Sequence, residues 1–293
     1  NGRRDGTGLA TPVAERIHGV RWRPHEPHPA TGSPEAPTPR TGRQRVETVA
    51  APGGPRLVLI GPPGAGKGTQ ARRLAAKLGI PHVDVGSLLR AEVRAGTPLG
   101  QEAERFLARG LLVPDELVNR LVERRLGALG PRRGFVVDGY PRSVAQAEAL
   151  DRFLRREGLR LSAVLHLRVP DEVVVDRLAG RIVCPDCGAV FHRTANPPRA
   201  GERCPACHTI IREVAPGVLQ CEACGRPLRR RPDDQPEIVR RRLAIYHQEV
   251  KPILSYYRQQ GLLRDVDGEG SEDEVFRRIL AALGLADGPS RRA

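Results

Sequence analysis

A glycine-rich run at residues 61–69 offers the clearest chemistry in the sequence, reading Gly-Pro-Pro-Gly-Ala-Gly-Lys-Gly-Thr. Glycines let backbone N–H groups curl around an anion without Cβ clashes, and Lys67 supplies a mobile cation. The run lies between an apolar segment and a helical pattern, so a helix N-terminus would add partial positive charge. We predict that it cradles phosphate with Gly64, Ala65, Gly66, Lys67, Gly68 and Thr69. Because Gly68 stands where a hydroxyl usually follows the lysine, we expect a divalent metal to be held mainly by phosphates and water.

All six cysteines lie in residues 184–224, as three C-x-x-C pairs. Pairs clustered inside a larger chain indicate metal ligation rather than a disulfide framework. Structural zinc takes four ligands, so one pair is surplus. The spacing from the first pair favours a site made of Cys184, Cys187, Cys204 and Cys207. The glycine that follows the third pair favours the alternative second pair, Cys221 and Cys224, and two histidines are possible substitutes, His192 and His208. A segment this poor in apolar residues is expected to need the metal to fold.

The composition suggests one class of partner and argues against others. The chain has 293 residues, 39% of them apolar, and its formal net charge of +14 suggests anionic partners such as nucleotides. Aromatic residues are only 3% of the chain and the basic residues are dispersed, so we expect no nucleic-acid binding. No run approaches the roughly 20 apolar residues of a membrane span, and we expect no membrane association. We identify no secretory signal and therefore expect a cytoplasmic protein.

The elements that would position these residues begin at Arg56. Short buried-type runs predict strands at 56–60, 135–137, 163–169 and 262–266. Helical patterns alternate with them, at 67–78, 87–95, 99–109, 115–126, 144–157, 171–178, 236–260 and 271–283. This alternation predicts an α/β fold with a parallel sheet covered on both faces. Residues 183–231 interrupt it and are expected to form a small inserted domain. Residues 1–54, rich in Pro and Gly, are predicted to be a disordered or artefactual extension, and residues 286–293 a disordered tail.

Extended to G-P-P-G-A-G-K-G-T-Q, the glycine-rich run resembles the nucleoside monophosphate kinases, closest to the adenylate kinase family. Further motifs similar to that family follow in order: Asp138-Gly-Tyr-Pro-Arg142 with Gln146, Asp176-Arg177 with Gly180-Arg181, Arg231-Pro-Asp233-Asp234, and Arg240-Arg-Arg242. The resemblance runs from Arg56 to about Leu283. It implies a P-loop NTPase-type parallel sheet flanked by helices over residues 55–285. The implied parts are a core of 55–83, 114–182 and 232–285, an inserted helical NMP-binding part at 84–113, and a zinc-ribbon-like lid at 183–231.

The same resemblance implies a reaction and the roles of individual residues. The terminal phosphoryl group of MgATP would pass reversibly to AMP, giving two ADP, in a monomeric enzyme of adenine nucleotide homeostasis. The implied catalytic residues are Lys67, Asp138, Arg142, Arg181, Arg231 and Arg242. ATP would be bound by residues 64–69 with Arg177 and Arg181, and AMP by Val85, Arg90, Gly139, Arg142, Gln146, Arg231 and Arg242. Asp138 matches the carboxylate that holds the water shell of Mg²⁺, and Asp233 and Asp234 match carboxylates that help the lid close. An arginine-rich site also suits the chemistry, because phosphoryl transfer depends on charge neutralisation and alignment.

One departure from the family keeps other functions open. The chain reads Asp84-Val85-Gly86-Ser87 where the family usually reads S-T-G-D, so Val85 replaces a threonine that contacts the AMP base. We therefore expect AMP as the acceptor with a modestly raised KM, with CMP or UMP as the alternative. The residues do not separate an ATP donor from a GTP donor. More distant alternatives are a P-loop hydrolase that uses water as the acceptor and a zinc-ribbon protein that binds nucleic acid.

Overall fold

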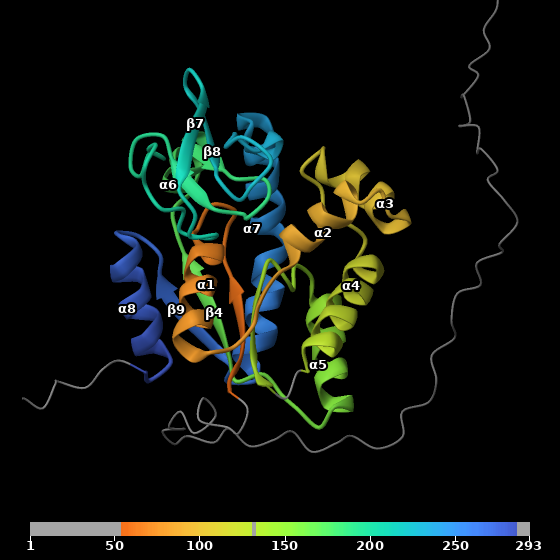
Figure 1. Ribbon diagram of the computed structural model, residues 1–293. Coiled ribbons are helices and arrows are strands. Elements are labelled where there is room, and N and C mark those ends of the chain that lie inside the picture. The colour runs from red at the N-terminus through yellow and green to blue at the C-terminus, as the bar shows by residue number, and fades with distance from the viewer. Residues whose placement is uncertain (1–53, 131–132, 286–293) are drawn as a thin grey trace, which may run out of the picture. The chain divides into compact units, whose positions relative to one another are not determined.

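The computed structural model describes residues 54–130 and 133–285 (Figure 1). Of the extension predicted for residues 1–54, residues 1–53 lie outside the described residues, as does the tail predicted for residues 286–293. A five-stranded parallel sheet runs through the described part, in the order β2-β3-β1-β4-β9. These strands are β1 Arg56–Ile60, β2 His82–Asp84, β3 Phe135–Asp138, β4 Ala163–Arg168 and β9 Leu263–Asp267. The predicted α/β fold with a parallel sheet is confirmed, and β1 occupies the middle position.

Alternate residues of β1 enter different buried clusters on the two faces of the sheet, as the pleat of a strand requires. Residues 58 and 60 join a cluster to which residues of α4 Asp115–Leu129, α5 Val144–Arg156 and α7 Pro236–Gln259 contribute, among other helices. Residues 57 and 59 join the opposite cluster, which includes two helices: α1 Lys67–Leu78 and α8 Glu272–Ala282. Figure 1 shows α1 and α8 on one side of the strands and α4 and α5 on the other. Burial on both faces explains why the central strands β1 and β3 read as short apolar runs.

Several helices begin at side chains that cap their free N–H groups. The Ser143 hydroxyl accepts from the backbone N–H of Gln146 and starts α5. Ser271 and Glu274 form a reciprocal capping box at the start of α8. Thr97 caps α3, Pro98–Leu107, which has a proline at its first position. The polar residues at these positions therefore fix where the helices start.

Strand β2 is the core element that the sequence did not reveal. It has only three residues, His82–Asp84, of which Val83 alone is buried. A run this short shows no periodicity. The helix that follows, α2 Val85–Arg94, begins two residues before the predicted start at 87, because the Asp84 carboxylate accepts from the backbone N–H of Ser87 and caps it.

Helices α2 and α3 pack closely against each other. At Gly100 of α3, an added Cβ would lie 2.1 Å from the carbonyl oxygen of Glu92 in α2. Only glycine permits this approach of the two backbones. The Arg124 side chain of α4 pairs with the Glu92 carboxylate at 2.5 Å and ties α2 to α4.

The cysteine-rich insert, residues 183–231, is built from short antiparallel pairs. Strand β5 Arg181–Val183 leads into it and pairs with β6 Val190–His192, and β7 Ile211–Ala215 pairs with β8 Val218–Cys221. Its buried cluster consists of seven residues: Cys184, Ala189, Phe191, Cys204, Ile211, Cys221 and Cys224. Because most of these are cysteines, sulfur supplies much of the interior of the insert.

Helix α6 Asp171–Ala179 precedes the insert. After the insert, a short 3₁₀ turn, Pro232–Asp234, leads into α7. Val174 and Leu178 of α6 pack on Val239 and Leu243 of α7 in a separate buried cluster. Both attachment points of the insert therefore rest on one helix pair. Within the described ranges, no helix has the length and apolar character needed to cross a membrane.

Candidate functional site

A cleft of about 750 Å³ lies at the carboxyl ends of β1 and β3. Open α/β sheets bind ligands at this edge, where the chain switches from one side of the first strand to the other. Its lining includes most of the predicted site residues: Gly64, Ala65, Gly66, Lys67, Gly68, Thr69, Arg90, Asp138, Gly139, Arg142, Arg177, Arg181, Arg231 and Arg242. The five arginines expected around phosphate, at 90, 142, 181, 231 and 242, thus meet at one cleft with Lys67. Val85 and Gln146 are buried and do not line it.

The glycine-rich run forms the turn between β1 and α1. Gly66 caps α1 with a φ of 86°, in the left-handed region that glycine tolerates. The Lys67 Nζ donates to the carbonyl oxygens of Gly61 and Pro62, both at 2.8 Å. A Cβ at Gly68 would lie 3.2 Å from the Oδ2 atom of Asp138. A glycine in place of the usual hydroxyl residue therefore lets the Asp138 carboxylate approach the start of α1.

Lys67 and Asp138 are a coupled pair of opposite charges. Burial lowers the pKa of Lys67 to about 8, against the opposing effect of Asp138. Burial likewise raises the pKa of Asp138 to about 6, although Lys67 acts in the other direction. Both groups are charged between these values, which is the state that suits an anionic nucleotide and a hydrated divalent cation.

Arg90 and Arg142 approach the cleft from α2 and from the loop after β3. The Arg90 Nη2 donates to the Ser87 hydroxyl at 2.8 Å, and the same hydroxyl donates to Asp84 at 2.5 Å. Burial alone would raise the pKa of Asp84, but Arg90 and the hydrogen bonds from Ser87 lower it. The Arg142 Nε donates to the Gly139 carbonyl at 3.0 Å. Each guanidinium keeps further N–H groups for a ligand, since arginine carries five donors.

Gln146 uses its amide inside the protein. Its Oε1 accepts from the backbone N–H of Arg142 at 2.7 Å, and its Nε2 donates to Asp115 at 2.7 Å. Asp115 also accepts from the Ser143 hydroxyl. In this arrangement the Gln146 side chain holds the loop that carries Arg142, and its predicted contact with the AMP base stays a prediction.

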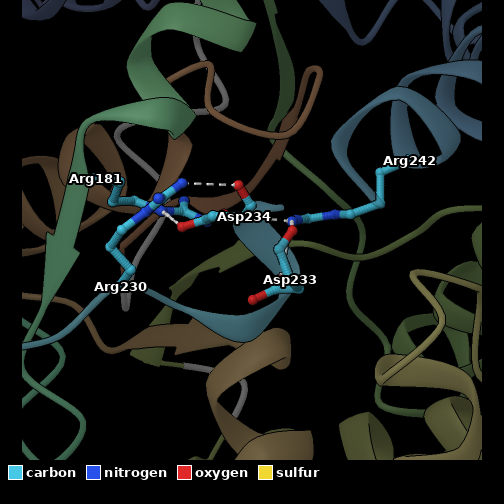
Figure 2. Close-up of polar contacts among 5 residues, drawn as sticks. All are labelled: Arg181, Arg230, Asp233, Asp234 and Arg242. Carbon is cyan, nitrogen blue, oxygen red and sulfur yellow. Dashed lines mark hydrogen bonds and ion pairs between the residues drawn. The ribbon is translucent and has the colours of Figure 1, made fainter. Parts of the chain in front are cut away.

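Asp233 and Asp234 compensate the arginines at the base of the insert, as Figure 2 shows. The Asp234 carboxylate accepts from Nε and Nη2 of Arg181 at 2.8 and 2.5 Å, and Asp233 accepts from Nη1 of Arg242 at 2.9 Å. Asp234 is 1% exposed, and its Oδ1 also lies 3.8 Å from Arg242. Arg230 donates to the Asp234 backbone carbonyl at 3.4 Å. Two carboxylates therefore hold two cleft arginines in fixed positions (Figure 2).

The cleft carries an excess of positive charge. Burial, together with the nearby charges of Arg181 and Arg90, lowers the pKa of Arg231 to about 9. Burial lowers the pKa of Arg242 to about 10, against the effect of Asp233. Like charges this close destabilise one another until an anion arrives, so a polyphosphate would be bound strongly.

Arg177 lines another part of the cleft, where its Nη2 donates to the Gly268 carbonyl at 3.1 Å. This contact joins the end of α6 to the loop after β9. The guanidinium is a flat cation, and such groups stack on aromatic rings of ligands. Its predicted position against the adenine ring remains a prediction.

The six cysteines carry free thiols and form two overlapping groups of four. Within each group, all Sγ atoms lie within 4.8 Å of one another. One group is Cys184, Cys187, Cys221 and Cys224; the other is Cys187, Cys204, Cys207 and Cys221. Four thiols at such separations fit tetrahedral zinc. The predicted set of Cys184, Cys187, Cys204 and Cys207 is neither of these groups, and its assignment stays a prediction.

Three polar residues of the site received no role from the sequence. Asp84 lines the cleft beside Arg90, Arg72 of α1 lines it as well, and Asp115 anchors Gln146. Asp84 could have been found as an acidic residue immediately before a helix. Asp115 likewise stands at the start of a helix, α4, whereas Arg72 lies within α1 and carries no such local signal.

Comparison with known proteins agrees with this geometry. The family model described as adenylate kinase matches residues 59–262. An adenylate kinase of Caldanaerobacter subterraneus subsp. tengcongensis is 44% identical over 228 residues, covering 78% of this chain and 96% of the relative. One of Moorella thermoacetica is 45% identical over 229 residues, covering 78% and 98%. One of Streptomyces griseus subsp. griseus is 46% identical over 233 residues, covering 79% and 99%. With its glycine-rich turn and converging arginines at the expected edge of the sheet, the chain belongs to the adenylate kinase family.

Proposed function

We propose that the chain transfers the terminal phosphoryl group of MgATP reversibly to AMP, giving two ADP, with the cleft residues in the roles described below. The observation that carries this proposal is the convergence of five arginines and Lys67 on one cleft. Phosphoryl transfer requires charge neutralisation and in-line alignment more than covalent help from the protein. The contribution of such an enzyme is adenine nucleotide homeostasis and the synthesis of ADP.

The donor nucleotide lies with its phosphates on residues 64–69. Lys67 exchanges its two backbone carbonyl contacts for the β- and γ-phosphates, and Arg181 neutralises the same group. Arg177 packs on the base. The Asp138 carboxylate would hold the water shell of Mg²⁺, and the ion would supply charge neutralisation to the phosphates. This role is supported by the close approach of Asp138 to Gly68.

The acceptor lies on the other side of the cleft. Arg90 and Arg142 grip the AMP phosphate, with Gly139 at its side, while Val85 and Gln146 shape the pocket of the base. Arg231 and Arg242 stabilise the phosphoryl group during transfer. Because Val85 offers no hydroxyl to the acceptor base, CMP and UMP are the competing acceptors, and GTP is the competing donor.

The division of labour between parts of the chain follows the same reasoning. Residues 84–113 clasp the monophosphate, and the cysteine-rich insert covers the triphosphate as a lid. A structural Zn²⁺ in the insert is supported by the clustered thiols and by an interior made mainly of cysteine. Four thiolates leave no open coordination position, so this metal stabilises the insert and takes no part in the reaction. The protein acts as a monomer in the cytoplasm.

A coupled assay of ADP formation from ATP and AMP tests the reaction. CMP, UMP and GMP are assayed in parallel as acceptors and GTP as the donor. A compound that links two adenosines through five phosphates should inhibit strongly, because it occupies both nucleotide sites at once. A preference for CMP or UMP, or ATP hydrolysis without an acceptor, would overturn the proposed substrates.

Two neighbouring arginines of α7 test the role of Arg242. Arg242→Gln should lower kcat/KM by about 10²–10³, the usual effect of removing one preorganised charge from a transfer site. Arg241→Gln is the matched control, because Arg241 is exposed and donates only to the Arg109 carbonyl. Its activity should stay within about twofold of the parent chain. Equal losses in both variants would refute a specific role for Arg242.

A further inference from the structure

The cysteine-rich insert holds more thiols than one tetrahedral zinc ion can use. The two groups of four cysteines overlap in Cys187 and Cys221. A single ion in either group would leave two of the six thiols without metal. The structure therefore raises the question of whether Cys204 and Cys207 are surplus or are themselves a ligand pair.

The turn at Cys204 has the same backbone form as the turn at Cys184. The Cys184 carbonyl accepts from the N–H of Gly188 at 3.0 Å, and the Cys204 carbonyl accepts from the N–H of His208 at 2.9 Å. The residue at this fifth position is left-handed in both turns, with φ of 74° at Gly188 and 60° at His208. Among residues 54–130 and 133–285, His208 is the only non-glycine residue with positive φ. A backbone conformation that is unfavourable for histidine is thus kept where it shapes a second cysteine turn.

Cys204 also points into the cluster rather than to solvent. Cys204 is fully buried, and its Sγ lies 3.7 Å from the Sγ of Cys187. A tetrahedral ion with zinc–sulfur bonds of about 2.3 Å has sulfur–sulfur edges of about 3.8 Å. Cys221, which belongs to both groups, is fully buried as well. The distance between Cys187 and Cys204 is therefore that of two ligands of one metal.

Two tetrahedra that share an edge have six corners, and the six Sγ atoms match this arrangement. We propose that the insert binds two Zn²⁺ ions that share the thiolates of Cys187 and Cys221 as bridges. The first ion is completed by Cys184 and Cys224, and the second by Cys204 and Cys207. Each thiol that becomes a ligand releases its proton to solvent. Six thiolates around two ions carry the same net charge as four thiolates around one, so the second ion adds no charge to the insert.

Counting the metal in the full-length protein tests this proposal without any measure of catalysis. The chain is loaded with zinc under reducing conditions, freed of weakly bound metal, and weighed by native mass spectrometry. We expect two zinc ions per chain and no thiol that reacts with an aromatic disulfide reagent before unfolding. One zinc ion with two reactive thiols would overturn the proposal. Because the readout is metal content, it stands or fails separately from the proposed phosphoryl transfer.

Two double variants, each lacking the unshared ligands of one ion, locate the two ions. Cys204→Ser with Cys207→Ser removes the unshared ligands of the second ion, and Cys184→Ser with Cys224→Ser removes those of the first. Each variant should keep one zinc ion, since each retains one complete group of four. If the first variant leaves the metal content of the parent chain unchanged, Cys204 and Cys207 are not ligands and the proposal is wrong.

Bridging is tested by replacing zinc with ¹¹³Cd and recording its NMR spectrum. Two metals joined through a shared thiolate give two signals that split each other, whereas separate sites give unsplit signals. We expect mutual splitting in the parent chain and one unsplit signal in the variant that lacks Cys204 and Cys207. Two unsplit signals would refute the shared ligands, and the parent spectrum decides the matter even if a variant fails to fold.

Discussion

Removing the charge of Asp234 should destabilise the folded protein. Its carboxylate is buried, accepts two hydrogen bonds from Arg181, and lies 3.8 Å from Arg242 (Figure 2). Asp234→Asn keeps the volume of the side chain but removes the negative charge and turns one acceptor into a donor. The new N–H donor would face the N–H donors of Arg181, and the positive charge of that guanidinium would lose its counter-charge.

The size of the effect follows from how deeply the pair is buried. Removing one partner of a buried ion pair costs about 3–5 kcal/mol. The Arg181 side chain is 14% exposed at the edge of the cleft, so water recovers part of that loss. We therefore expect Asp234→Asn to lower the free energy of unfolding by about 2–3 kcal/mol, because of this partial hydration. For a chain of this size that corresponds to a fall in Tm of about 4–12 °C.

Urea and thermal unfolding, followed by circular dichroism in a buffer without phosphate, provide the assay, because anions bound in the cleft would stabilise the folded state. Asp273→Asn is the matched control. Asp273 also pairs with an arginine, Arg73, at 2.5 Å, but its side chain is 81% exposed. An exposed pair contributes about 0–1 kcal/mol. The reasoning is refuted if Asp234→Asn destabilises the protein no more than Asp273→Asn does.

Three further outcomes are expected. Gly100→Ala should destabilise the protein by about 1–3 kcal/mol through overpacking. Gly127→Ala, in open space within α4, should stabilise it by about 0.5–1 kcal/mol. Denaturant midpoints of the two variants measure both effects, and equal effects would contradict the packing argument. The kcat/KM for MgATP should fall as pH drops through about 6, where Asp138 is protonated, and as pH rises through about 8, where Lys67 loses its charge. The Asp138→Asn variant should lose the part of the decrease at low pH that comes from protonation of Asp138. A pH profile that is the same in the variant as in the parent chain would contradict this assignment. Burial lowers the pKa of His166 below 6.5, so the unfolded chain binds a proton first and stability falls as pH drops below 6.5; urea unfolding of His166→Gln should show a flatter dependence, and an identical slope would refute the buried neutral imidazole.

The core of the fold could be predicted because its signals are local. The run at 56–60, the glycine turn and the helix from Lys67 each carry their own pattern, and the structure has β1 and α1 at those residues. Strand β2 was missed because three residues cannot express a period, and it forms through pairing with β3.

The site could be predicted in its members but not in its internal contacts. Motifs identified both Arg181 and Asp234, yet only folding shows that they bind each other across 53 residues of sequence. The cysteines illustrate the same limit. Spacing along the chain favours Cys204 and Cys207 as partners of Cys184 and Cys187. In the fold, Cys221, at the end of β8 where it pairs with β7, belongs to both groups of four. Distances between ligands depend on the fold of the insert, which linear spacing does not encode.

Helix α7 has a consequence for how the cleft can change shape. Its first half is held against α6 by Val239 and Leu243, and its second half against the sheet by Val250, Ile253 and Tyr257. The helix extends over about 36 Å, and Pro252, which has no backbone N–H, interrupts its hydrogen bonding ten residues beyond Arg242. Arg242 lies in the stretch of α7 before Pro252, which Leu243 packs against α6 and Val250 against the sheet cluster, whereas Arg181 and Arg231 stand at the two ends of the insert. Any movement of the insert would alter the distances from Arg181 and Arg231 to Arg242 and Lys67. Helix α7 therefore provides a reference against which closure could be measured.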